Sequence, residues 1–214
     1  MQVVLDNFHL MLAGLFVTIQ LSLQVILLGT LVGIVGGVLL LYGPGLVRGL
    51  VRVYVDIIRG LPLLVTIFII FYGIPAIGIP MPKFTAAVLA LTFFAGAHMT
   101  EIVRGAIGSI PRGQTEAGMS IGLTFLQRLR YVIFPQAIRR MVPPWVNLSV
   151  ELIKGSSLVS LVSITDLMLS TQEILERTAK PIPFYITAGV IYFILCYGFA
   201  TFGNRLERRF AYYD

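Results

Sequence analysis

Two charged side chains lie where the sequence is otherwise apolar. Glu151 and Lys154 stand three residues apart after Pro144, and Ser157 follows one turn later. If a membrane helix begins near residue 145, all three lie within the bilayer, where a charge costs at least about 2.5 kcal/mol and normally faces a cavity or a partner. One interpretation is an ion pair that neutralises both charges. The other is a substrate path, in which Glu151 favours substrates with a cationic group and Lys154 meets a carboxylate.

A second pair of opposite charges has a simpler interpretation. Glu101 and Arg104 are three residues apart, so they share a face of a helix and favour a structural ion pair. His9, His98 and Cys196 are too few and too scattered for a metal site, and a single cysteine forms no intrachain disulfide. No hydrolase or metalloprotease motif is present, so we expect no enzyme activity. The nucleotide-binding motif Gly-x-x-x-x-Gly-Lys-[Ser/Thr] is also missing, so ATP and Mg²⁺ would be bound by a partner and this chain would need no cofactor.

The composition indicates a membrane protein. Of 214 residues, 57% are hydrophobic and 12% are charged, against about a quarter charged in soluble domains. No charge lies between Asp6 and Arg48, and two later stretches are similarly free of charge. Each stretch holds about 20 apolar residues, enough for a helix to cross a hydrocarbon core roughly 30 Å thick. The lipid bilayer is therefore the expected surrounding, and the net charge of +6, without a basic block or groove-reading motif, does not indicate nucleic acid.

The fold class that follows is all-α, a polytopic membrane protein in one domain, 1–214, with five spans. We predict the spans at about 10–41, 61–79, 84–103, 145–167 and 184–204. The first run is long, and a helical hairpin with a turn near Gly29 is its alternative. Gly29, Gly33 and Gly37, however, are spaced by four, which is typical of a packing stripe on one helix face. We therefore favour one long or tilted helix.

The basic residues predict the orientation. Twelve arginines fall in one set of loops, three basic residues fall in the opposite set, and Lys154 lies within span four. Basic loops remain in the cytoplasm. The N-terminus is therefore expected outside and the C-terminus inside, with the loop between spans three and four in the cytoplasm.

That loop, 109–140, has the pattern of two short helices. Residues 114–120 can form the first, with Glu116 in the first turn, where negative charge is favourable, and Gly122 as a stop signal. A second helix would begin near residue 125 and present Phe125, Leu129 and Val132 on one face. Such amphipathic helices either lie on the lipid surface or dock into a groove of a soluble partner.

The loop resembles the EAA motif of permease subunits in bacterial binding-protein-dependent ABC importers. That motif reads Glu-Ala-Ala, three residues, Gly, nine residues, Ile, one residue and Leu-Pro. Its counterparts here are Glu116, Ala117, Gly118, Gly122, Val132, Phe134 and Pro135. The spacing matches throughout, and the departures at 118, 132 and 134 exchange one small or apolar residue for another.

Other stretches resemble the polar amino acid branch of the same family. They are Ile-Arg-Gly-Leu-Pro-Leu-Leu at 58–64, Glu-Ile-Val-Arg-Gly at 101–105, Pro-Gln-Ala at 135–137, and Lys154 with Leu-Val-Ser at 158–160. Each stretch alone is a weak signal. Their order and spacing together are specific, and they cover most of the chain from Tyr54 to Asp166.

The resemblance implies a permease subunit in the bacterial inner membrane. Its EAA helix would sit in a cleft of an ABC ATPase subunit, and a pair of these ATPases would drive a rigid-body switch between inward-open and outward-open states. The chain would pair with a second copy or a sister permease, and an extracytoplasmic solute-binding protein would deliver the substrate. The branch implies a polar amino acid or related zwitterion, including an opine or a compatible solute. The alternative, a self-sufficient secondary transporter or channel, would have no use for the docking loop and would be expected to show repeated halves, which we do not find.

Overall fold

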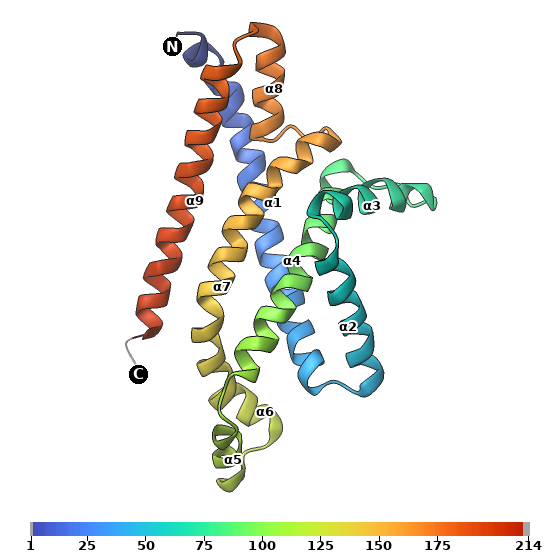
Figure 1. The fold of residues 1–214 in the computed structure, drawn as a ribbon, viewed down its shortest axis with the longest axis vertical. Helices are drawn as coiled ribbons and strands as arrows, with labels where there is room; N and C mark the ends of the chain where they lie inside the picture. Colours follow the sequence, from blue (N-terminus) through green and yellow to red (C-terminus); the bar gives the residue numbers. More distant parts are fainter. Residues whose placement is uncertain (1, 212–214) are drawn as a thin grey trace.

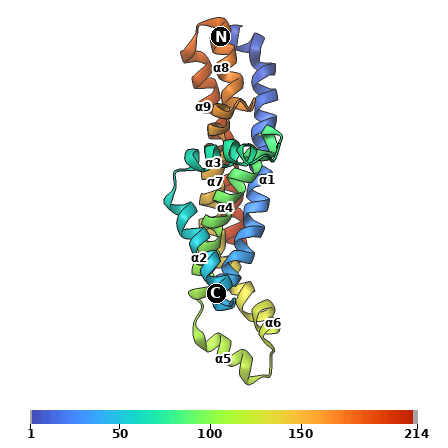
Figure 2. The same cartoon turned by 90° about the vertical axis from the view of Figure 1, so that its right-hand side faces the viewer.

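The computed structural model describes residues 2–211, and its regular elements there are all helical (Figure 1). In chain order they are α1 (Gln2–Tyr42), α2 (Gly45–Gly60), α3 (Leu63–Ala76), α4 (Lys83–Gly108), α5 (Arg112–Ser120), α6 (Phe125–Arg128), the π-helix η1 (Leu129–Ile133), α7 (Phe134–Gly155), the 3₁₀-helix η2 (Ser156–Val162), α8 (Leu167–Thr178) and α9 (Pro181–Ala211). The molecule is elongated. The start of α1 and the turn from α8 to α9 lie at one end, and α5 and α6 lie at the other (Figures 1 and 2).

Helix α1 is a single helix of 41 residues with no turn near Gly29. Its glycine stripe packs directly on α4. A Cβ built on Gly29 would lie 2.5 Å from the Cβ of Ala95, and one built on Gly33 would lie 2.3 Å from the Cβ of Met99. Since Cβ atoms do not approach so closely, α1 and α4 reach this separation only because these positions carry glycine.

We expect Gly33→Ala to destabilise the protein by about 1–3 kcal/mol, because the new methyl group would push α1 away from Met99 over the whole shared face. Gly189→Ala is the matched control, since a Cβ at Gly189 on α9 meets no atom within 4 Å. The measurement is thermal unfolding of the two purified variants in the same detergent. Equal melting temperatures for both variants would contradict the tight contact between α1 and α4.

The second predicted span is broken. Instead of one helix over 61–79, α2 and α3 meet at an angle of 112°, and α3 has only 14 residues. Leu61, between them, is extended with φ −100° and ψ 142°, because the ring of Pro62 disfavours helical backbone at the residue before it. Helix α2 runs alongside α4, and α3 lies across the molecule (Figure 1).

The helix that carries the fourth predicted span begins before residue 145. We expected a start at residue 145, after two prolines, but α7 begins at Phe134 and includes Pro143 and Pro144. Neighbouring helices can compensate for the backbone hydrogen bonds that proline removes from a membrane helix. The helical backbone from Phe125 to Val162 ends at Ser163, whose φ is +58°, and α8 continues at an angle of 50°. Glu151 lies in the last two turns of α7.

Three helices are each long and apolar enough to cross a membrane: Asp6–Tyr42, Lys83–Gly108 and Pro181–Arg209. The number rises to five if each of the two bent pairs, α2 with α3 and Phe125–Val162 with α8, forms one span. The predicted count of five is thus the upper end of the range that the helices allow. The all-helical membrane architecture itself is confirmed.

Candidate functional site

Residues 112–128, which we call the docking segment after its expected role, project from one end of the molecule (Figure 2). They form the two short helices α5 and α6, joined by a tight turn. Helix α5 begins at Arg112, two residues earlier than predicted, because Pro111 precedes it and its fixed φ favours helix initiation. Glu116 and Ala117 are exposed on α5. Gly122 has a φ of +77°, a left-handed conformation that glycine adopts without strain. Gly122 therefore allows the chain to turn between α5 and α6.

Gly118, which stands where the EAA motif has alanine, is buried against an arginine side chain. A Cβ at Gly118 would lie 3.0 Å from Cγ of Arg128 and 3.1 Å from its Cδ. Arg128 crosses this point and donates a hydrogen bond from Nη1 to the carbonyl oxygen of Leu123 at 3.0 Å. The departure from the motif therefore makes room for an internal brace between α5 and α6.

The helical backbone continues from α6 into the long helix α7 without a break. It begins with a capping box between Thr124 and Gln127, and it passes through η1 into α7. Pro135 lies exposed in the first turn of α7, where a missing N–H causes least disruption. Gln136 Nε2 donates to Gln114 Oε1 at 3.2 Å and thereby ties α7 to α5. Helix α5 is therefore linked to α7 both along the chain and by this hydrogen bond.

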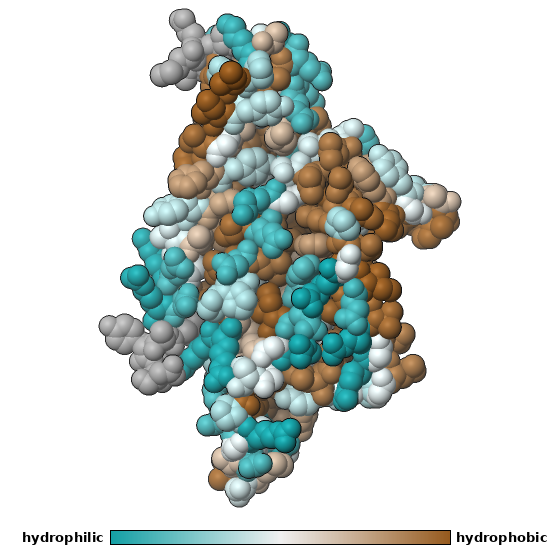
Figure 3. Space-filling model, viewed as in Figure 1, coloured by the Kyte–Doolittle hydropathy of each residue, from teal (hydrophilic) through white to brown (hydrophobic). Residues whose placement is uncertain are grey.

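Helix α2 separates a polar face from an apolar face. Its exposed apolar residues are Leu46, Leu50, Val53 and Ile57. Arg52, Asp56 and Arg59 are exposed on another side of the helix. Figure 3 shows hydrophilic residues over α2 and the neighbouring part of α4, and hydrophobic residues along the outer edge beside them. In a membrane protein, the apolar face suits lipid, and the polar face suits a water-filled path or a protein partner.

The predicted ion pair between Glu101 and Arg104 is present, and Arg52 is a second basic residue close to Glu101. Glu101 Oε2 accepts hydrogen bonds from Arg104 Nε at 2.9 Å and Nη2 at 2.7 Å. Arg52 Nη1 on α2 lies 3.8 Å from Glu101 Oε1. Arg52 was not predicted as a member of this group, although the spacing of the charged residues 52, 56 and 59 is a signal in the sequence that this helix carries a polar face.

Glu151 and Lys154 are not joined. No ion pair links them within residues 2–211, and both side chains are exposed. Lys154 and Ser157 line a pocket of about 310 Å³ on the side of α8 and α9, whose other lining residues are Met168, Tyr185, Ala188, Gly189 and Tyr192. Glu151 is not among the residues that line this pocket. The interpretation as a mutually neutralising ion pair is therefore wrong, and the three predicted path residues divide between two surroundings.

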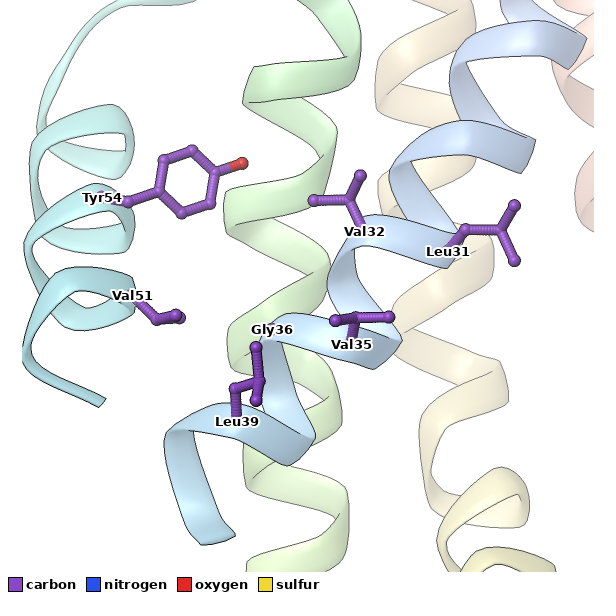
Figure 4. A pocket seen from close by; sticks show the side chains of 7 residues that line it. All are labelled: Leu31, Val32, Val35, Gly36, Leu39, Val51 and Tyr54. Atoms are coloured by element: carbon purple, nitrogen blue, oxygen red, sulfur yellow. The ribbon is translucent and has the colours of Figure 1, made fainter. Parts of the chain in front are cut away.

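A larger groove of about 450 Å³ lies between α1 and α2 (Figure 4). Its lining residues are Leu31, Val32, Val35, Gly36, Leu39, Val51 and Tyr54. The only polar side chain among them, Tyr54, donates its hydroxyl to the carbonyl oxygen of Phe93 at 2.6 Å. This groove offers no charged group to a zwitterion and suits apolar chains.

The described residues contain no group of three or more His, Cys, Asp or Glu side chains placed to hold a metal ion. Glu116, Gly122 and the polar residues of α2 and α4 are the other places where the described structure gathers candidate functional residues. None of them combines an activated nucleophile with a general base.

Comparison with known proteins gives consistent matches along the chain. Residues 26–212 match the family model described as binding-protein-dependent transport system inner membrane component. The chain is 34% identical to a probable amino-acid ABC transporter permease protein, YckA, of Bacillus subtilis, over 98% of this chain and 92% of YckA. It is 38% identical to the L-cystine transport system permease protein TcyB of B. subtilis, over 94% of this chain and 86% of TcyB.

Similar relations hold for a third relative and for solved structures. The chain is 32% identical to the glutamine transport system permease protein GlnP of Escherichia coli, over 94% of this chain and 92% of GlnP. It resembles the crystal structure of an amino acid ABC transporter with histidines at a TM-score of 0.89 and 32% identity, covering 96% of each chain. The methionine ABC transporter MetNI shares the fold, with a TM-score of 0.81 at 23% identity over 94% of this chain and 96% of that one.

Proposed function

This chain belongs to the family of binding-protein-dependent transport system inner membrane components, and from that premise we propose that it forms the translocation path for a polar amino acid or related zwitterion. It is a multi-pass permease subunit of an ABC transporter and not itself an enzyme. The observation that carries the substrate class is the similarity, over nearly the whole chain, to permeases named for cystine and glutamine transport.

We propose that Glu116, Ala117, Gly118, Gly122 and Pro135 couple the permease to the ATPase. The exposed face of α5 enters a cleft of the ATPase, and α6 and η1 carry its displacement into α7. The bridge from Gln136 to Gln114 supports this coupling, because it holds α5 to the base of α7 at a second point. The closing of two ATPases then shifts α7 between inward-open and outward-open arrangements.

The path itself is proposed along the polar face of α2, α4 and α7. Glu151 would meet the cationic group of the substrate there, and Lys154 and Ser157 would contribute through the pocket that they line on the side of α9. The contact between Glu101 and Arg104 would fix the shape of α4 below this point. A second copy of this chain or a sister permease would cover the polar face and complete the path.

Transport in proteoliposomes tests the proposed function. The permease is reconstituted with its ATPase and binding protein, and uptake of radiolabelled L-glutamine, L-cystine and other amino acids is measured with ATP inside. The expected result is uptake that needs both ATP and the ATPase. Uptake by the permease alone, driven by a sodium or proton gradient, would instead establish a secondary transporter.

Labelling of single cysteines tests the orientation. In a variant without Cys196, cysteines at Lys83 and Arg177 should react with an impermeant reagent added to intact cells, and cysteines at Arg128 and Arg209 should be protected. The reason is that basic residues concentrate on the side of the docking segment. Detergent-permeabilised cells are the control, since all four positions should react there. Labelling of the second pair alone in intact cells would invert the proposed topology.

A further inference from the structure

The apolar groove between α1 and α2 has the dimensions of one lipid acyl chain. It follows α1 from Leu31 to Leu39, which is roughly 12 Å of helix, and its volume is about 450 Å³. Each leaflet of a bilayer contributes about 15 Å of hydrocarbon, half of the apolar core. A helix of the same length, about 10 Å across, would fill roughly 900 Å³, so the groove suits a thinner chain.

The walls of the groove present no unpaired polar group. Figure 4 shows Val51 and Tyr54 of α2 pointing toward α1. The Tyr54 hydroxyl already donates to the carbonyl oxygen of Phe93 on α4, so only its ring is left to the groove. The exposed side chains of Leu27 and Leu28, which precede the groove on α1, are apolar as well. A hydrocarbon chain in the groove would therefore leave no polar group of its walls without a partner.

A cation lies at the end of the groove where α1 turns into α2. Arg48 Nη2 donates to the carbonyl oxygens of Leu41 at 3.4 Å and of Gly43 at 3.3 Å, which holds the guanidinium against the end of α1. Leu41 is two residues from the lining residue Leu39, and Arg48 is one turn from the lining residue Val51. No carboxylate lies within ion-pair distance of Arg48 among residues 2–211. Since a guanidinium carries several N–H donors, others remain available to an anion.

The same end of the groove has the features of a membrane surface. Tyr42, the last residue of α1, is exposed, and tyrosine is enriched at the level of the lipid head groups. Its ring packs edge-on against Phe125 at the start of α6, with 5.0 Å between ring centroids. The docking segment projects beyond the long helices at this end (Figure 2). An acyl chain in the groove would therefore place its head group at the level of Arg48.

We propose that the groove binds one anionic phospholipid, with an acyl chain between α1 and α2 and the phosphate on Arg48. A guanidinium is suited to two parallel hydrogen bonds to a phosphate, and basic pockets between membrane helices are suited to lipid head groups. The groove gives the chain packing contacts, because the surrounding lipid is equally apolar, and Arg48 selects the head group. The ammonium of phosphatidylethanolamine would add a second positive charge beside Arg48, whereas phosphatidylglycerol adds none. The inference goes beyond the proposed function and is independent of the substrate path.

The test is lipid binding to the purified permease–ATPase complex, delipidated in detergent and measured by native mass spectrometry. Dioleoyl phosphatidylglycerol and dioleoyl phosphatidylethanolamine are titrated separately, so that the two probes differ in the head group alone. We expect phosphatidylglycerol to bind more tightly. Arg48→Gln should raise its Kd at least about tenfold, the effect of one charge-assisted hydrogen bond. Arg208→Gln, the same change at an exposed arginine in the last turn of α9, should leave that Kd unchanged.

Filling the groove is the second arm of the test. Val35→Trp should raise the Kd of both lipids at least about tenfold, because the indole takes the space of the acyl chain and removes its packing contacts. Val190→Trp is the matched control, since Val35 and Val190 are 59% and 51% exposed and Val190 lies on α9. Val51→Phe fills the groove from α2 in case Val35→Trp does not assemble. Inorganic phosphate should not displace phosphatidylglycerol, because it has no acyl chain to pack between the helices.

Every result decides the question. An Arg48→Gln complex that still prefers phosphatidylglycerol, or equal effects of Arg48→Gln and Arg208→Gln, would overturn the inference. Displacement by inorganic phosphate would show a site for free anions and overturn it as well. If Val35→Trp and Val51→Phe bind lipid normally, separate the two permeases or both fail to assemble, the groove is not a lipid site; separation would mean that the second permease covers it. The measurement does not involve uptake, so failure of the proposed function leaves the test intact.

Discussion

Replacing Gly122 with valine is expected to abolish ATP-driven transport while the permease still inserts into the membrane. The φ of Gly122 is +77°, and a β-branched residue is strained there by about 1–3 kcal/mol. That strain lowers the population of the native turn by roughly 5- to 150-fold. No atom lies within 4 Å of a Cβ at this position, so the loss would come from the backbone and from any contact with the ATPase. Crowding inside the permease would not contribute.

Matched variants separate the two causes. Gly113, on α5, also has open space for a Cβ, and its φ is not positive, so Gly113→Ala should transport nearly normally while Gly122→Ala is impaired. Gly122→Asn should be milder than Gly122→Val, because asparagine tolerates the left-handed conformation. Glu116→Lys reverses an exposed charge on the same surface and should weaken co-purification with the ATPase, with Glu116→Gln as the milder comparison. If Gly122→Val and Glu116→Lys both co-purify and transport normally, α5 is not the coupling helix.

The sequence was informative where one physical effect dominates. The run from residue 7 to residue 42 carries no Asp, Glu, Lys or Arg and repeats glycine every four residues from Gly29 to Gly37, and both patterns favour a single packed helix in lipid. The EAA spacing and Gly122 likewise predicted a helix, a turn and a second helix, because a left-handed turn depends on a single residue type. Local signals of this kind need no knowledge of the neighbouring helices.

The sequence was misleading where two effects compete. Proline was expected to start a helix at residue 145, but α7 passes through Pro143 and Pro144 because its neighbours stabilise it. Pro62, by contrast, does interrupt the helix, between α2 and α3. Helical spacing placed Glu151 and Lys154 near one another, yet no ion pair joins them among the described residues, and Lys154 lines a pocket with residues of α8 and α9 that Glu151 does not line. Tertiary packing decides which helix lies against each face of α7. The spacing of residues along α7 alone does not predict this.

Glu151→Gln is expected to reduce transport by roughly 10- to 150-fold, which corresponds to the loss of one charge-assisted hydrogen bond of about 1.5–3 kcal/mol to a cationic substrate group. Glutamine keeps the size and the polar oxygen of glutamate and removes the negative charge alone. Since no ion pair joins Glu151 to Lys154, the substitution leaves no basic partner on α7 unpaired. Stability should therefore change little, and the effect should appear in transport.

Glu173→Gln supplies the control, because it makes the same chemical change at an exposed position on another helix, α8. Both variants are reconstituted with wild-type ATPase and binding protein, and uptake is measured together with basal ATP hydrolysis and assembly. Loss of uptake in Glu151→Gln alone, with assembly and basal hydrolysis preserved, supports a role in the path. Glu151→Asp keeps the charge on a shorter side chain and should retain more transport than Glu151→Gln, since a carboxylate can still attract an ammonium across a small gap. Uptake and selectivity equal to wild type in Glu151→Gln would make Glu151 a structural charge, and the polar face would then have to bind its substrate through α2 and α4 alone.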